Sequence, residues 1–202
     1  MRIPRFLALL SLALVTLCAA SFAFQYDFST LPAGVNTHTF TGPGGFMVTV
    51  SGFDLSGDPA PDTVLAYKND SSTEQGLGLV NDPSGQNEIT GNSFIQLSGS
   101  ITSLIFNSVQ GAEGWAIFES NVSGSGNLGT PFATGSGPTW SLAGVTMTYV
   151  SVFATGPVGT APNILVGANG PDARVPEPGT TAMIMTLGLV GLFEVGRRKL
   201  MA

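Results

Sequence analysis

The 202-residue sequence predicts an all-β fold, an antiparallel β-sandwich of jelly-roll type, for residues 24–170. Three observations lead to this prediction. Short runs of alternating apolar and polar residues recur along the chain, turn-forming residues bound each run, and no stretch has the 3.6-residue period of an amphipathic helix. A segment of this length can bury one core, so we expect a single domain.

Seven runs carry the strand pattern, within an expected total of about seven to ten strands. They are Phe46–Val50, Thr63–Lys68, Ser93–Leu97, Thr102–Phe106, Trp115–Glu119, Val145–Phe153 and Asn163–Val166. The run Val145–Phe153 has apolar residues at both alternating sets of positions, so both of its faces should be largely buried. Clusters of Gly, Pro, Asn, Asp and Ser separate the runs.

Charge is unevenly distributed along the chain. Seven basic and 13 acidic residues give a net charge of -6, and from Phe24 to Gly170 there are ten acids but a single base, Lys68. Nucleic-acid binding needs clustered Lys and Arg, so no nucleic-acid partner is expected. An acidic surface keeps copies apart, which favours a monomer. One His and one Cys cannot build a Cys/His zinc site or an internal disulfide.

Residues 1–23 have the pattern of a secretory signal peptide. Arg2 and Arg5 precede the apolar run Phe6–Leu17, and Ala23 offers a small residue for cleavage. The alternative of a plain membrane anchor is disfavoured because the apolar run is shorter than the ~20 residues of a spanning helix. Cys18 would suit a lipoprotein, but the preceding residue is not small. The secretion translocon and signal peptidase are therefore expected partners.

Residues 171–202 combine a proline box, an apolar stretch and a basic end. The candidate sorting residues are Val175, Pro176, Glu177 and Pro178 in the box and Arg197 and Arg198 at the end. The stretch between them, residues 179–196, would span roughly 27 Å as a single transmembrane helix, about the thickness of the hydrocarbon core. The terminal cations place the carboxyl end in the cytoplasm. The two prolines keep the box extended and remove two backbone donors, which suits a protease substrate.

The order of box, helix and basic end resembles the PEP-CTERM sorting signal of Gram-negative bacteria, over residues 175–202 only. The resemblance implies an exosortase, an integral-membrane cysteine protease or transpeptidase, as the partner that cuts near the box. It also implies transient inner-membrane anchoring, transfer to the cell surface or extracellular matrix, and an association with exopolysaccharide and biofilm-matrix systems. Glu194 departs from the usual apolar span but can pair with Arg197 or Arg198. A Pro-rich stalk ahead of a permanent anchor is the alternative.

An interior segment, residues 75–97, resembles a pattern of exported PEP-CTERM sandwich domains, although Thr90 stands where that pattern has Asp. Asn81, Asp82 and Glu88 are hard oxygen donors on neighbouring loops and form a candidate Ca²⁺ site. Alternatively, the first two belong to a plain turn and Glu88 caps a hairpin. No other cofactor is expected.

No catalytic residue set is expected. His38, the single imidazole, is predicted to lie in a polar turn. Glu113 and Glu119 would lie roughly 20 Å apart on a regular strand, whereas glycosidase carboxylates are about 5–9 Å apart. Trp115 and Trp140 are either core residues, the more usual case in a sandwich, or a sugar-stacking platform.

We therefore expect an exported surface or extracellular-matrix protein that is not an enzyme, with a structural or exopolysaccharide-associated domain. The alternative is a jelly-roll glycoside hydrolase or lyase acting on exopolysaccharide.

Overall fold

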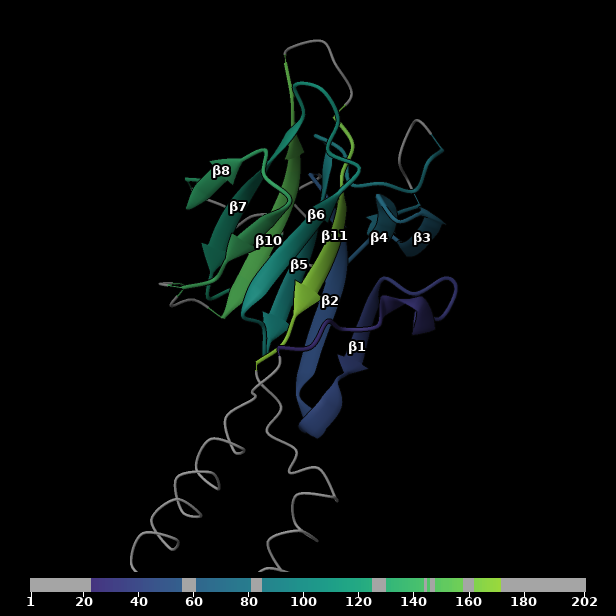
Figure 1. Cartoon of the computed structure of the whole chain (residues 1–202), viewed down its shortest axis with the longest axis vertical. Coiled ribbons are helices and arrows are strands. Elements are labelled where there is room, and N and C mark those ends of the chain that lie inside the picture. The colour runs from purple at the N-terminus through teal and green to yellow at the C-terminus, as the bar shows by residue number, and fades with distance from the viewer. Residues whose placement is uncertain are drawn as a thin grey trace, which may run out of the picture.

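The computed structural model describes residues 23–55, 61–80, 85–124, 130–143, 145, 148–157 and 162–171. The predicted signal peptide and sorting tail lie outside these residues, apart from Ala23 and Pro171. The described part is all-β, as predicted, with eleven strands (Figure 1). Its helical content within the described ranges is two 3-10 turns, Phe28–Thr30 and Pro43–Gly45, and neither could cross a membrane.

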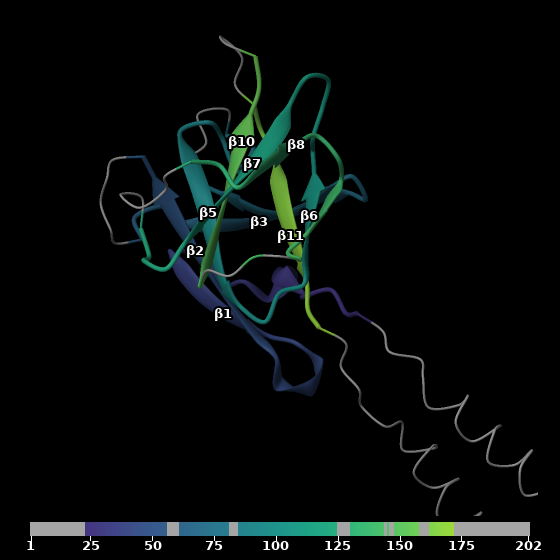
Figure 2. The same cartoon turned by 90° about the vertical axis from the view of Figure 1, so that its left-hand side faces the viewer.

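The strands form two fully antiparallel sheets. In spatial order, the six-stranded sheet contains β1 (Thr37–Thr41), β2 (Met47–Asp54), β5 (Ser93–Gly99), β10 (Tyr149–Thr155), β7 (Gly114–Ser120) and β8 (Ala133–Gly135). The five-stranded sheet contains β3 (Leu65–Ser71), β4 (Glu74–Leu79), β11 (Leu165–Asn169), β6 (Ser103–Asn107) and β9 (Thr139–Ser141). Figure 2 shows β2 and β5 in one layer and β6 and β11 in the other.

The main core lies between the two sheets. Each strand turns alternate residues inward, so Val48 and Val50 of β2 meet side chains of the opposite sheet such as Leu77 and Val166. All four are fully buried. This shared cluster packs the two antiparallel sheets against each other, so the predicted all-β sandwich character is confirmed for the described residues.

A second apolar cluster lies on the other face of the six-stranded sheet. Phe53, Phe94 and Phe153 occupy paired positions on β2, β5 and β10, and their rings stack with centroids 5.0 and 4.6 Å apart. Because β10 contributes to both clusters, residues 150–154 are all buried. This confirms the prediction that both faces of this run are covered, although the strand begins at Tyr149 rather than at Val145.

All seven predicted runs correspond to observed strands, with shifted ends in some cases. The four strands that the pattern missed are β1, β4, β8 and β9. β1 is a polar edge strand with one fully buried side chain, β4 carries two glycines, and β8 and β9 have three residues each. The placement of His38 in a turn was wrong, since it lies in β1 with its ring 4.7 Å from that of Phe40.

Candidate functional site

Of the residues predicted for the sorting signal and the calcium site, the structure describes only Glu88. The sorting residues Val175, Pro176, Glu177, Pro178, Arg197 and Arg198 lie outside the described ranges, as do Asn81 and Asp82 of the calcium candidate. Glu88 lies between β4 and β5, and its side chain is 1% exposed. The side chains that contact the Glu88 carboxylate form the first candidate site.

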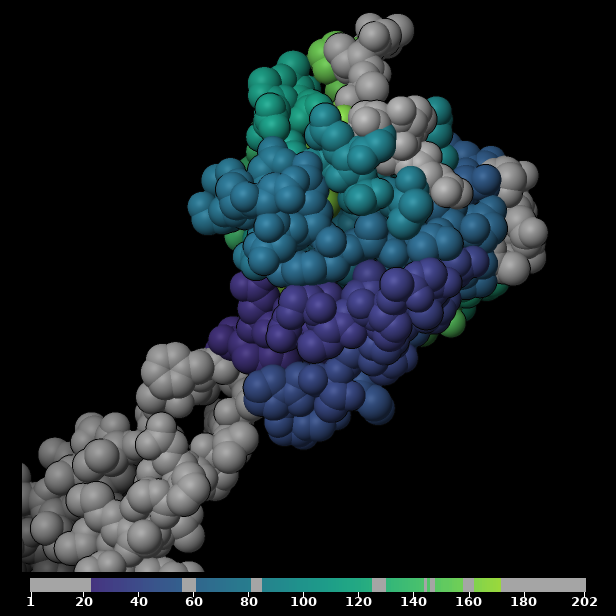
Figure 3. Space-filling model, turned by 90° about the vertical axis from the view of Figure 1, so that its right-hand side faces the viewer, coloured from purple at the N-terminus to yellow at the C-terminus, as the bar shows by residue number. Residues whose placement is uncertain are grey.

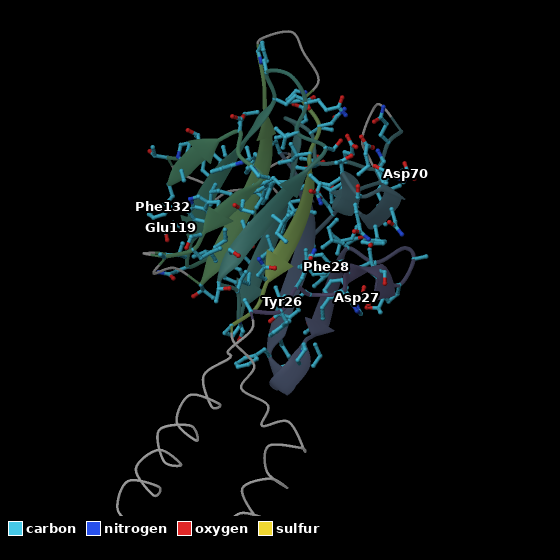
Figure 4. The ribbon with its side chains drawn as sticks, in the orientation of Figure 1. Tyr26, Asp27, Phe28, Asp70, Glu119 and Phe132 are labelled. Atoms are coloured by element: carbon cyan, nitrogen blue, oxygen red, sulfur yellow. The ribbon has the colours of Figure 1, made fainter. Side chains whose placement is uncertain are left out.

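Glu88 belongs to a buried ionic group, which we call the Lys68 cluster: Lys68, Glu74, Glu88 and Ser108. The ammonium Nζ of Lys68 lies 2.8 Å from Oε1 of Glu88 and 2.6 Å from Oε2 of Glu74. Exposure of the three charged side chains is 9% for Lys68, 26% for Glu74 and 1% for Glu88. Asp70 lies further away, at 3.8 Å, and is exposed at the edge of the domain (Figure 4).

Strand alternation explains how Lys68 reaches this position. Leu65 points into the core between the sheets, so Lys68, three residues along β3, points to the outer face of the five-stranded sheet. Directly opposite on β4 is Gly76, and Ala66 is opposite Gly78. A side chain at Gly78 would collide with the backbone of Asn87 and Glu88, so the missing Cβ allows the Glu88 segment to lie against the sheet.

Ser108 and Gln110 complete the polar contacts of the two glutamates. The Ser108 hydroxyl donates to Oε1 of Glu88 at 2.9 Å and is 3.4 Å from Oε1 of Glu74, while Nε2 of Gln110 donates to Glu74 at 3.2 Å. Ser108 follows β6 and has a φ of 62°, a conformation uncommon outside glycine. Its N–H donates to the carbonyl of Thr73 at 3.0 Å. The cluster thus ties β3, β4, the end of β6 and the Glu88 segment together.

The electrostatics of the cluster keep Lys68 charged. Burial disfavours the ammonium, but the hydrogen bonds and charges of Glu74 and Glu88 outweigh this, so the pKa of Lys68 is held above its ordinary value. The hydrogen bond from Lys68 lowers the pKa of Glu74, burial opposes this in part, and the charge of Lys68 and the contacts from Ser108 and Gln110 add to the lowering. A permanently protonated lysine is neither a general base nor a nucleophile.

The predicted calcium site is described only at Glu88. Oε1 of Glu88 is occupied by the Lys68 ammonium and the Ser108 hydroxyl. Among the described residues, which omit Asn81 and Asp82, no three His, Cys, Asp or Glu side chains are arranged to hold a metal ion. Calcium binding by Asn81, Asp82 and Glu88 stays a prediction.

A second candidate site is an aromatic row at the open edge of the sandwich, where β8 and β9 end the two sheets. Phe106, Trp115, Trp140 and Phe132 follow one another with ring centroids 4.7, 6.3 and 5.9 Å apart. Trp115 is in the core, 5% exposed, and its indole N–H donates to the carbonyl of Gly137 at 2.8 Å. This confirms the core placement of that tryptophan.

The row reaches solvent at its other end. Trp140 is half-buried on β9, and Phe132 is 45% exposed just before β8. Figure 4 shows Phe132 at the margin of the domain, on the opposite side from Asp70. Residues 130–143 contain no Asp, Glu, Lys or Arg, and Thr134, Thr139 and Ser141 are exposed there. This edge offers partly exposed aromatic rings and hydroxyl groups, and residues 130–143 add no charge to it. One carboxylate is close by, because the N–H of Phe132 donates to the carbonyl of Ile117 at 2.7 Å and Glu119 lies two residues further along β7, beside Phe132 in Figure 4.

Glu113 and Glu119, the two carboxylates considered for a glycosidase, lie at different places and have different neighbours. Glu113 precedes β7 and accepts backbone N–H groups from Gln110 at 2.8 Å and Asn163 at 3.2 Å. Glu119 lies within β7, opposite Val150 of β10. Glu113 therefore acts as a cap for two loops.

Sequence reasoning missed Ser108, Glu74 and Phe132 as site residues. The one available signal was that Lys68 is the single base among ten acids, which indicates a paired lysine without naming its partners. Phe132 lies in a Gly-, Pro- and Thr-rich segment where no strand pattern marks it.

Comparison with protein-family models, with curated proteins and with solved structures finds no match to this chain. The function has to be inferred from the side chains themselves.

Proposed function

We propose that this chain is the precursor of an exported surface or extracellular-matrix protein of a Gram-negative bacterium. In this proposal residues 1–23 are removed as a signal peptide, and residues 171–202 anchor the chain in the inner membrane until an exosortase cuts near Val175–Pro178. The β-sandwich, of jelly-roll type, is the functional module. It acts without catalysis, as a structural domain that associates with exopolysaccharide.

The aromatic edge is the observation that carries the polysaccharide association. Phe132 and Trp140 are in edge-to-face contact and partly exposed where β8 and β9 end the two sheets, and the exposed hydroxyls of residues 134, 139 and 141 can hydrogen-bond to sugar hydroxyls. Aromatic rings stack well on the apolar faces of pyranose rings, because the C–H groups of those faces are poorly hydrated and little hydration is lost when the ring covers them. Residues 130–143 add no charge to this edge, whereas the domain as a whole has ten acids and one base, so repulsion of an acidic polysaccharide is weaker here than over the rest of the surface.

The Lys68 cluster supports the non-catalytic role. Oε2 of Glu74 and Oε1 of Glu88 are at most 5.4 Å apart, the sum of their 2.6 and 2.8 Å distances to Nζ of Lys68. Retaining glycosidases have carboxyl groups about 5–5.5 Å apart, but the sugar must lie between them. Here the lysine ammonium lies between them and Glu88 is 1% exposed. A hydrolase or lyase is the competing function.

Replacing Phe132 with alanine is expected to weaken retention on exopolysaccharide about tenfold, because an exposed stacking ring is worth on the order of 1–2 kcal/mol. Affinity electrophoresis in gels containing the polysaccharide measures this. Leu55→Ala, which removes another side chain exposed to a similar degree (49%), should leave retention unchanged. Release of reducing ends or unsaturated sugars by the native chain would instead favour the enzyme.

Deleting Pro176–Pro178 is expected to block removal of the tail. The surface-exposed form should then be heavier than the wild-type form by the uncut tail, which intact-mass spectrometry of released protein detects. Replacing Asp172, Ala173 and Arg174 with serine leaves the box intact and should leave processing unchanged. If the deletion lowers the mass by three residues only, the segment is a permanent anchor and the sorting proposal is wrong.

A further inference from the structure

The two ends of the described domain are held together at one end of the sandwich. The N–H of Gly170 donates to the carbonyl of Phe24 at 2.8 Å, and the N–H of Tyr26 donates to the carbonyl of Ala168 at 2.9 Å. Figures 1 and 2 place both ends of the described chain beside the β1–β2 hairpin. Whatever lies before residue 23 or after residue 171 therefore leaves the domain next to this hairpin.

The hairpin tip, residues Gly42–Met47, is apolar and projects at this end. The ring of Phe24 occupies the space that a side chain at Gly42 would need, and it stacks on Phe46 with centroids 6.2 Å apart. Met47 is 56% exposed, and Pro43 is exposed as well. Figure 3 shows the hairpin extending beyond the N-terminal segment that runs beside it.

Charge is absent from the segments that build this end. Residues 28–53 and 95–112 contain no Asp, Glu, Lys or Arg, although the domain has ten acids. Asp27 and Asp54 flank the first of these segments. Asp27 caps the 3-10 turn Phe28–Thr30 and is set back from the tip in Figure 4, and Asp54 ends β2 at the opposite end from the tip. The rest of the acidic surface is repelled by anionic lipid headgroups, whereas this end is not.

We infer that the hairpin tip docks on the lipid bilayer while the chain is anchored, with Met47 and Phe46 in the headgroup region. The inference rests on the proposed function, in which the membrane helix begins near Gly179. From Pro171 to Gly179 there are eight residue steps, which reach at most roughly 29 Å when extended. Such a short tether keeps the tip at a high local concentration near the bilayer, so even weak apolar binding of the tip to the headgroup region is populated. The bilayer thus sets the orientation in which the box is offered to its protease.

The test places a probe at each end of β2 in the full chain. Met47→Cys and, as matched control, Leu55→Cys are made in a Cys18→Ser background, labelled with nitrobenzoxadiazole, and reconstituted into phosphatidylethanolamine–phosphatidylglycerol vesicles. The two positions are similarly exposed and about 26 Å apart along the strand. We expect a blue shift and quenching by nitroxide-labelled lipid at position 47 but not at position 55. Pro43→Cys provides a second probe of the tip, and circular dichroism reports folding of each variant.

Flotation of the vesicles separates the two ways of failing. Chain that does not float with the vesicles overturns the anchoring in the proposed function and this inference with it. Chain that floats but shows equal quenching at positions 47 and 55 overturns the docking inference alone. A blue shift at position 47 without quenching by labelled lipid points to a second copy of the chain as the partner and also overturns it.

Discussion

Replacing Lys68 with methionine is expected to lower the free energy of unfolding by about 3–5 kcal/mol, because removing one partner of a buried ion pair leaves the other charge unpaired. Methionine keeps most of the apolar stem of lysine, so the loss comes from the charge. Glu88, at 1% exposure, would keep only the Ser108 hydroxyl of the contacts that bind its Oε1. Urea unfolding followed by the fluorescence of Trp115 and Trp140 measures the change.

The matched control is Asp70→Asn. Asp70 is 72% exposed and 3.8 Å from the same ammonium, so its replacement should change stability by less than about 1 kcal/mol. A Lys68→Met variant as stable as this control would show that the contacts between Lys68 and the two glutamates add little to stability, and the cluster would then not organise this side of the sandwich.

The pH dependence of stability provides a second readout for the same variant. The raised pKa of Lys68 contributes stability below its ordinary value of 10.5 that is lost as the pH rises through the folded value. The lowered pKa of Glu74 contributes stability above its ordinary value of 4.5 that is lost as the pH falls through the folded value. The cluster should therefore stabilise most between these limits, and Lys68→Met should flatten the acid side of the profile.

The sequence predicts most strands because their signal is local. Val150 and Val152 alternate with Ser151 and Phe153, and that pattern alone indicates a strand covered on both faces, which the structure confirms. β8 and β9 have no such signal, since three residues are too few to show a period of two. They form because Trp115 and Leu104 on neighbouring strands offer pairing partners.

The candidate sites were harder to predict because their residues meet only through the fold. Lys68 and Glu88 are twenty positions apart, and Glu74 and Ser108 thirty-four, so no spacing rule links them. The exposed end of the aromatic row depends on which sheet edges face solvent, and this is a property of strand order. Gly78 falls within residues 75–97, whose sequence gives it no structural role, whereas in the structure its missing Cβ leaves room for the backbone of Asn87 and Glu88.

Replacing Gly78 with alanine is expected to lower the free energy of unfolding by at least about 2 kcal/mol, because an added methyl in a closed space typically costs 1–3 kcal/mol. The new Cβ would collide with the carbonyl of Asn87 and crowd the Cα of Glu88, both backbone atoms that no rotamer change can move away. The Glu88 segment must therefore move off β4, which also pulls the carboxylate away from Lys68. Gly91→Ala is the matched control, because the nearest atom to its Cβ would be Pro162 Cγ at 3.8 Å.

The double variant Gly78→Ala with Lys68→Met distinguishes a local clash from a displaced carboxylate. If Gly78 acts by holding Glu88 against Lys68, part of the ion pairing is already lost in Gly78→Ala, so the two effects should sum to about 1–2 kcal/mol more than the double variant shows. Unfolding in urea at neutral pH gives all four free energies. Strict additivity would mean that the Glu88 segment stays in place and the sheet deforms instead, and the glycine would then have no part in building the cluster.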